Sequence, residues 1–163
     1  IIYLKNKHTL QDDNFYFKCS IGKNGLTKKK IEGDKKTPIG SFKISHLYYR
    51  KDRIKKPQTQ LHCVSIKKDM GWCDDLANKK NYNKLIKINK NIKHEKLYRK
   101  DKKYDLLIPI KYNFNNTIIG KGSCIFIHLT KNYLPTAGCI ALEEKDFLIM
   151  LKILRKNTKI KIF

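Results

Sequence analysis

The stretch IHLTKNYLPTAGCIAL, residues 127–142, is the part of the sequence from which the fold and the chemistry are best predicted. It carries one histidine, His128, and one cysteine, Cys139, in an apolar run that a Pro-Thr-Ala-Gly segment interrupts. Apolar residues lead into His128 and follow Cys139, which predicts a buried strand, a loop and a second short element. A thiol that follows a glycine turn lies near backbone N–H groups, and an adjacent imidazole can take its proton. The stretch fits either a cysteine acyl-transfer site or a buried cysteine and histidine of the core.

Length and composition indicate a single domain that spans residues 1–163. A chain of 163 residues with 40% hydrophobic residues is large enough for a real core and is typical of a folded globular protein. No apolar run approaches the roughly 18 residues that a membrane span needs, so we expect no membrane span in this chain.

The chain is strongly basic, with 37 Lys and Arg against 14 Asp and Glu, a net charge of +23. This charge attracts polyanions such as nucleic acid, anionic lipid or an acidic wall polymer. Lysine and asparagine are also spread through predicted loops such as Lys87–Lys93, which is typical of compositional drift. Basic runs such as Lys28–Lys30 are not interleaved with aromatic residues, so we expect no specific nucleic-acid partner.

The five cysteines form no CxxC motif, which excludes the common redox and zinc-ribbon patterns. Cys124, His128 and Cys139 have the donor types of a metal site but lack a fourth ligand at a zinc-like spacing. We therefore expect neither a metal nor another cofactor. The spacing of Cys63 and Cys73 does not establish whether they form a disulfide.

The apolar pattern predicts a mostly-β domain of the α+β class. Strands are predicted at residues 1–4, 15–21, 41–44, 61–66, 105–113, 122–128 and 158–163. Residues 46–60 and 67–83 are predicted to be irregular or rich in turns, and a turn of the hairpin type is predicted at residues 22–25. Pro109 within its strand indicates an edge or a bulge.

One helix is predicted late in the chain, over Glu143–Lys156. Four apolar residues recur there at helical spacing: Phe147, Met150, Leu151 and Leu154. The segment Lys93–Tyr98 is also compatible with a short helix. Strands at short intervals, one late helix and a closing strand predict a sandwich-like or barrel-like sheet arrangement.

Two segments far apart in the sequence resemble one enzyme family. GDKKTPIGSF, residues 33–42, resembles the GDxxTPxGxF signature of the L,D-transpeptidases of the YkuD type. His128 followed by TAGC, residues 136–139, resembles the catalytic His and [Ser/Thr]-x-Gly-Cys motif of the same family. Segments around Trp72, Tyr82 and Tyr104 are similar to a proteobacterial branch. The resemblance implies a YkuD-like sandwich with its active site in a crevice between sheets.

The resemblance also implies a role for each residue of the second motif. Cys139 would be the nucleophile and His128 the base that makes or stabilises its thiolate. The carbonyl of Leu129 would fix the imidazole tautomer, and the N–H groups of Cys139 and Gly138 would form an oxyanion hole. Thr136 would shape the turn or hydrogen-bond the substrate.

The implied reaction is the cross-linking of peptidoglycan stem peptides through a thioester. D-Alanine, or an equivalent group, leaves, and an amine of a second stem resolves the acyl-enzyme. The resemblance implies action in the periplasm or at the outer face of the cell envelope. Two alternatives stay open: a cysteine hydrolase of the same fold, such as an L,D-carboxypeptidase, and a non-catalytic basic module that binds wall polymer or nucleic acid.

Three features depart from the family pattern. Ala137 precedes Gly-Cys where many members have a histidine or another polar residue, and Ala141 stands where an arginine or asparagine usually follows Cys-Ile. His128 and Cys139 are eleven positions apart, a shorter separation than is common. These changes leave the nucleophile and the base in place but leave open how the stem carboxylate is bound.

Four further residues are candidate substrate ligands, each with a structural alternative. Arg50 can bind a stem carboxylate or lie in a solvated basic loop. Asp75 can receive the ammonium of diaminopimelate or cap a turn. Trp72 can line the crevice or belong to the core, and Asn113 can hold a loop near the site or form an ordinary turn.

Overall fold

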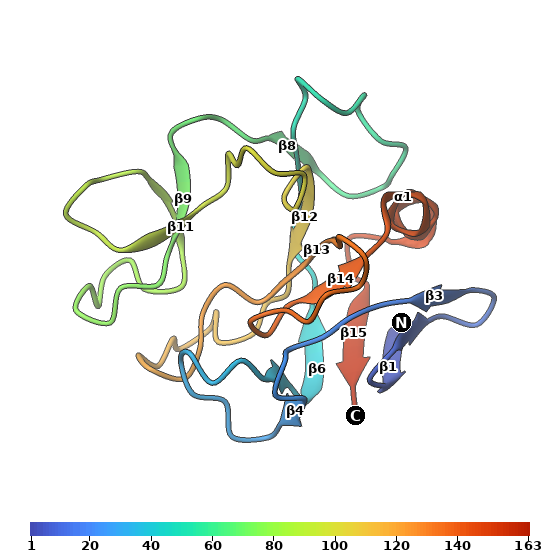
Figure 1. Cartoon of the computed structure of the whole chain (residues 1–163), viewed down its shortest axis with the longest axis horizontal. Helices are drawn as coiled ribbons and strands as arrows, with labels where there is room; N and C mark the ends of the chain where they lie inside the picture. Colours follow the sequence, from blue (N-terminus) through green and yellow to red (C-terminus); the bar gives the residue numbers. More distant parts are fainter.

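The computed structural model describes residues 1–163. The strands predicted at residues 105–113 and 122–128 lie side by side in a five-stranded sheet (Figure 1). In this central sheet the strand order is β14-β13-β12-β7-β8. The strands are Leu47–Tyr49 (β7), Cys63–Ser65 (β8), Leu106–Pro109 (β12), Phe126–Leu129 (β13) and Ile140–Leu142 (β14). Every residue of β12, β13 and β14 is buried, because both faces of the sheet are covered.

Alternation along β13 sends its side chains to two different cores. Ile127 and Leu129 belong to the larger apolar core, on one face of the sheet. Phe126 belongs to a smaller core on the other face, together with Leu107 of β12. Because His128 is two residues from Phe126, its side chain is directed to the face of the smaller core.

The larger core lies between the central sheet and a second five-stranded sheet, the N-terminal sheet, with order β3-β2-β1-β15-β6. Its strands are Ile2–Asn6 (β1), Thr9–Gln11 (β2), Tyr16–Lys18 (β3), Gly40–Lys43 (β6) and Lys159–Ile162 (β15). β15 is the predicted closing strand, and it pairs in parallel with β1. Both sheets are open, so the sandwich prediction fits and the barrel prediction is wrong.

The predicted late helix is present as Glu144–Ile153 (α1), shorter at both ends than the sequence indicated. Phe147, Met150 and Leu151 are buried, and they pack into the larger core as their spacing predicted. Acidic residues lie in the first turn and Lys152 in the last, which matches the helix dipole. No helix in the structure is both long enough and apolar enough to cross a membrane.

A three-stranded antiparallel sheet, the small sheet, covers the other face of the central sheet. It contains Met70–Cys73 (β9), Leu85–Lys87 (β10) and His94–Lys96 (β11), with β9 in the middle. In Figure 1 it lies on the opposite side of β12 and β13 from α1. The helix expected near Lys93–Tyr98 is wrong, because backbone pairing with β9 holds this segment as a strand.

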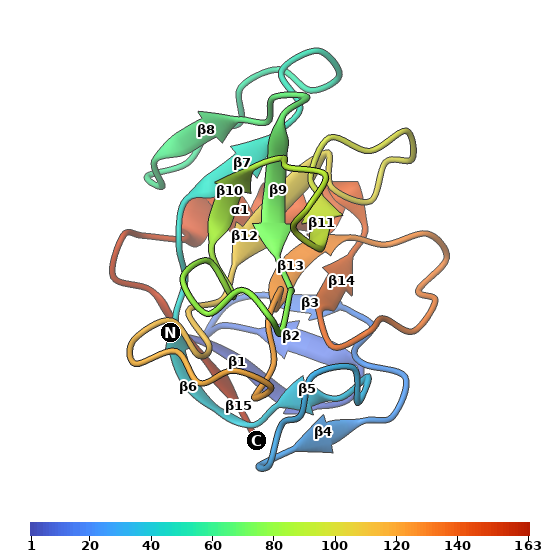
Figure 2. The ribbon, with the colours of Figure 1, turned by 90° about the vertical axis from the view of Figure 1, so that its left-hand side faces the viewer.

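Three further predictions are corrected by the sheet pairings. Residues 46–60 and 67–83 are not wholly irregular, because they contain β7 and β9. The turn at residues 22–25 forms but closes no hairpin, because β3 pairs with β2 while Leu26–Thr27 (β4) pairs in parallel with Thr37–Pro38 (β5) (Figure 2). Pro109 does not lie in an edge strand, because it is the last residue of β12, an interior strand. β7 pairs only with Leu106 and Leu107 of β12, so Pro109 lies beyond that pairing.

Candidate active site

Strand register places Cys139 and His128 on the same face of the central sheet. β13 and β14 are parallel, with Ile127 opposite Ile140 and His128 opposite Ala141. Cys139 directly precedes β14 and therefore lies level with Phe126, two positions before the level of His128. A strand spacing of about 4.8 Å and a rise of about 3.3 Å per residue separate the two Cα atoms by roughly 8 Å. Cys139 accordingly belongs to the smaller core with Phe126.

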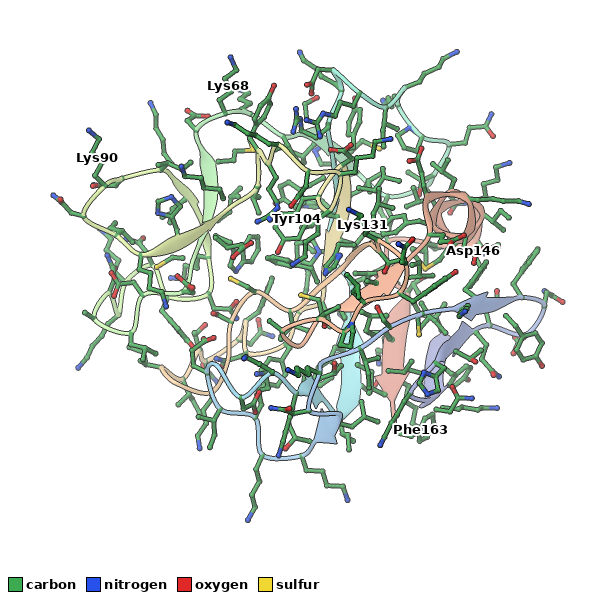
Figure 3. The ribbon with its side chains drawn as sticks, in the orientation of Figure 1. Lys68, Lys90, Tyr104, Lys131, Asp146 and Phe163 are labelled. Carbon is green, nitrogen blue, oxygen red and sulfur yellow. The ribbon has the colours of Figure 1, made fainter.

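His128 is buried with one ring nitrogen bonded and the other unpaired. Its Nδ1 lies 2.8 Å from the carbonyl oxygen of Leu129, as predicted, so Nδ1–H donates there and Nε2 is left as an acceptor. Nε2 is buried and has no hydrogen-bond partner. The ring of Tyr104 packs edge-on against the imidazole, with 5.4 Å between the ring centroids. Tyr104 lies between the small sheet and the central sheet (Figure 3). Burial, followed by the charge of Lys103, lowers the imidazole pKa to about 3.

Cys139 is held as a neutral thiol. Its S–H donates to the carbonyl oxygen of Cys124 at 3.1 Å, and Sγ accepts the N–H of Phe126 at 3.4 Å. The residue is 7% exposed, and burial raises the thiol pKa to about 11, although the Phe126 N–H acts in the opposite direction. The thiol and the imidazole are not hydrogen-bonded to each other, so both groups are neutral in this conformation.

The turn before Cys139 is closed by Thr136. The Thr136 hydroxyl accepts the N–H of Gly138 at 3.1 Å and donates to the carbonyl oxygen of Cys139 at 2.6 Å. Thr136 therefore shapes the turn, one of the two roles expected for it. The Gly138 N–H, expected in an oxyanion hole, is already used inside the turn, whereas the N–H of Cys139 has no hydrogen-bond partner.

The segment with the Thr-Pro sequence is bonded to the same turn. The Thr37 hydroxyl donates to the carbonyl oxygen of Gly138 at 2.8 Å and accepts the N–H of Gly22 at 2.9 Å. Gly138 has φ +136°, and a Cβ atom there would lie 2.9 Å from the carbonyl oxygen of Lys36. Thr37 was not named as a site residue from the sequence, although it is part of the Thr-Pro signature.

Trp72 is a core residue that a buried asparagine fixes. It packs edge-on against Phe126 at 5.3 Å, and its Nε1–H donates to Oδ1 of Asn83 at 3.0 Å. The same Oδ1 accepts the N–H of Cys124 at 3.2 Å. Cys124 has φ +55°, and its carbonyl is the acceptor of the Cys139 thiol. Asn83 therefore joins the small sheet to the backbone that contacts the nucleophile candidate.

Arg50 is buried and its guanidinium group is occupied within the protein. It makes two hydrogen bonds to the carboxylate of Asp52, at 2.9 and 2.7 Å, and one to the carbonyl oxygen of Arg99 at 2.6 Å. The guanidinium also lies 3.6 Å above the ring centroid of Tyr98. These contacts stabilise the loop that follows β7.

Asp75 and Asn113 hydrogen-bond to the backbone of turns and loops. The carboxylate of Asp75 accepts the N–H of Ala77 at 3.0 Å and that of Lys93 at 3.2 Å. Asn113 has φ +54°, and its side chain bonds to the backbone of Ile118 and Gly122. Their role as substrate ligands remains a prediction, as it does for Arg50 and Trp72.

A cavity of about 580 Å³ opens beside His128. The candidate site residues that line it are His128, Leu129 and Thr136; Cys139, Gly138, Arg50, Trp72, Asp75 and Asn113 do not. The other lining residues are Asp101, Lys102, Lys103, Thr130, Lys131, Leu134, Pro135 and Ala141. Ala141 lies level with His128, so the residue that departs from the family pattern leaves space in the cavity wall.

The cysteines form neither a disulfide nor a cluster of metal-binding side chains. All five cysteines are free, Cys63 and Cys73 included. No group of three or more His, Cys, Asp or Glu side chains is placed to hold a metal ion.

Comparison with known families gives one match. The model of the YkuD family, described as the L,D-transpeptidase catalytic domain, matches residues 1–162. Comparisons with curated proteins and with solved structures give no match.

Proposed function

The chain belongs to the YkuD family of L,D-transpeptidase catalytic domains, and from this membership and its site we propose that it cross-links peptidoglycan stem peptides with Cys139 as nucleophile and His128 as general base. Envelope peptidoglycan is the proposed substrate, in the periplasm or at the outer face of the cell envelope. The proposal requires no metal or other cofactor, because thiol and imidazole chemistry is sufficient for acyl transfer.

The observation that carries the proposal is the contact between the two distant motifs. The Thr37 hydroxyl bonds the carbonyl oxygen of Gly138 and so ties the Thr-Pro segment to the turn before Cys139. Strand register directs Cys139 and His128 to one face, and the cavity opens beside His128. The two motifs therefore contribute to one site, as a shared catalytic role requires.

In the proposed first step, Sγ of Cys139 attacks the stem-peptide carbonyl carbon while Nε2 of His128 takes the thiol proton. The N–H of Cys139 has no other partner, so it is available to the developing oxyanion. The carbonyl–nitrogen bond then breaks, and the imidazolium returns its proton to the amine of the departing D-alanine. In the second step an amine of another stem attacks the thioester, loses its proton to Nε2 and forms the new amide, and the thiolate regains a proton.

The first step needs the thiol to turn. At rest its hydrogen is directed to the carbonyl oxygen of Cys124 and not to Nε2 of His128. With the thiol pKa raised to about 11 and the imidazole pKa lowered to about 3, the neutral pair is more stable than the ion pair. The proton therefore moves during attack on a bound carbonyl, which makes His128 a general base and not the partner of a preformed thiolate.

The surroundings of Cys139 support transfer over hydrolysis. Trp72, Tyr104 and Phe126 are buried in the same cluster as Cys139. Apolar surroundings limit the access of water to a thioester, which gives an incoming amine time to react. Hydrolysis by the same intermediate is the competing reaction.

Incubation with purified stem tetrapeptides, followed by mass spectrometry, tests the proposal. Cross-linked dimers together with released D-alanine are expected, and Cys139→Ala should abolish them. Trimmed monomers alone would assign a hydrolase. An unchanged yield in Cys139→Ala would remove the cysteine from the reaction and leave the non-catalytic basic module as the explanation.

Acylation by a carbapenem separates reactive chemistry from substrate choice. One covalent adduct is expected by intact-mass measurement, and it should be absent in Cys139→Ala. Cys63→Ala is the matched control, because Cys63 is also free but lies in β8, outside the smaller core. Loss of the adduct in Cys63→Ala with retention in Cys139→Ala would contradict the assignment.

A further inference from the structure

Two residues that line the cavity each carry a buried polar atom without a hydrogen-bond partner in the protein. The atoms are Nε2 of His128 and the hydroxyl oxygen of Thr130. The lack of a partner at Nε2 is explained by its proposed role as proton acceptor. The proposed reaction gives no such reason for the unpaired Thr130 hydroxyl. A buried hydroxyl without a partner is costly, which indicates that a ligand satisfies it when the site is filled.

The end of β13 places Thr130 and Lys103 next to the catalytic imidazole. Thr130 is two residues beyond His128, so its side chain is directed to the same face of the sheet. Its N–H donates to the carbonyl oxygen of Leu142 at 2.7 Å, which continues the pairing with β14. The N–H of Leu129 donates to the carbonyl oxygen of Lys103 at 3.0 Å, which fixes the Lys103 backbone alongside the strand.

The charges around the cavity are uncompensated. Lys102, Lys103 and Lys131 line it, and none of the three forms an ion pair. Asp101 is the one acidic residue in the lining, and Arg99 holds its carboxylate through two hydrogen bonds at 2.8 and 2.7 Å. The cavity therefore has positive charge and a free hydroxyl donor, which are the requirements for binding an anionic oxygen group.

Lys103 is the lysine whose position relative to the reacting groups is best defined. Its Nζ lies 5.2 Å from the ring centroid of Tyr104, and that ring packs on His128 with 5.4 Å between centroids. Its positive charge lowers the pKa of both His128 and Cys139.

We propose that the Lys103 ammonium and the Thr130 hydroxyl form a subsite that binds a carboxylate of the acyl donor, beside His128. The inference rests on the proposed function and adds the residues that bind the donor's free carboxylate close to the scissile carbonyl. Ala141 carries no charge at the level of His128, so the cation comes from the segment before β12 instead of from β14.

Binding measured without turnover tests the subsite. The probes are a stem tetrapeptide ending in D-alanine and the same peptide with a C-terminal carboxamide, titrated into Cys139→Ala by calorimetry. The acid should bind about 10- to 100-fold more tightly than the amide, as expected for a charge-assisted hydrogen bond. The preference should disappear with Lys103→Met and decrease with Thr130→Val, whereas Lys103→Arg and Thr130→Ser should largely keep it.

Lys90→Met is the matched control, because Lys90 is exposed and lies at the edge of the molecule, away from the central sheet (Figure 3). It should keep the preference for the acid. Equal affinity for acid and amide in Cys139→Ala, or a preference that Lys103→Met leaves unchanged, would overturn the subsite. Failure of the wild type to form an acyl-enzyme with either peptide is a separate result, which would overturn the proposed function while the binding data still decide the subsite.

Discussion

Acid should destabilise this protein through His128 by an amount that can be calculated. The imidazole is buried and neutral, with a pKa of about 3 in the folded state against 6.5 for the free side chain. Between these two pH values the unfolded chain binds a proton that the folded chain does not, so stability falls as pH falls. At pH 5 the loss relative to pH 7 is about 2 kcal/mol, and any folded-state pKa below about 4 gives nearly the same value.

Urea unfolding at pH 7 and pH 5 measures this loss directly. His128→Gln removes the titrating group, so the variant should lose about 2 kcal/mol less than the wild type between the two pH values. Carboxylates titrate equally in both proteins and cancel in the comparison. His8→Gln is the matched control, because His8 is exposed, and its loss should equal that of the wild type. Equal losses in wild type and His128→Gln would refute the description of His128 as a buried neutral base.

Three further predictions concern the turn before Cys139 and the thiol itself. Gly138→Ala should destabilise the protein by at least about 1 kcal/mol and reduce acylation, because a Cβ would meet the Lys36 carbonyl oxygen at 2.9 Å; near-normal values in urea unfolding and acylation assays would contradict this. Thr37→Val should cost about 1–3 kcal/mol in urea unfolding, because it leaves the Gly22 N–H and the Gly138 carbonyl without their partner, while Thr37→Ser should cost less. Alkylation of Cys139 by iodoacetamide should be slow at pH 7 and should accelerate as pH rises toward about 11; a rate plateau below pH 8 would indicate a preformed thiolate instead.

The strands that the sequence predicted well are those whose residues alternate or are uniformly apolar. β1, β12, β13 and β15 all face an apolar core, so burial leaves its pattern in the residue types. The helix α1 was visible for the same reason. β11 was missed because His94, Glu95 and Lys96 carry no such pattern. Its conformation comes from hydrogen bonds to β9, more than twenty residues away, and a short local window contains no information about that pairing.

The site was predictable only as far as the motifs reached. The resemblance singled out Cys139, His128 and the carbonyl of Leu129 as candidates, and in the structure that carbonyl oxygen contacts Nδ1 of His128. It gave no indication that Arg50 is buried against Asp52, although that pair is only two residues apart in the sequence. Thr130 was not recognised either, because an unpaired hydroxyl becomes apparent only when every neighbouring donor and acceptor has been placed.

The short separation of eleven residues between His128 and Cys139 does not prevent them from lying on the same face of the sheet. The pairing of β13 with β14, and not the length of the loop between them, sets their relative position. β13 and β14 are adjacent parallel strands, and the register of Ile127 opposite Ile140 fixes which residues share a level. The connection between the strands, residues 130–139, is free to change length while that register is kept. Its residues 130, 131 and 134–136 line the cavity beside the imidazole. A shorter connection therefore changes the wall of the cavity and what it can hold, while Cys139 and His128 stay on the same face of the sheet.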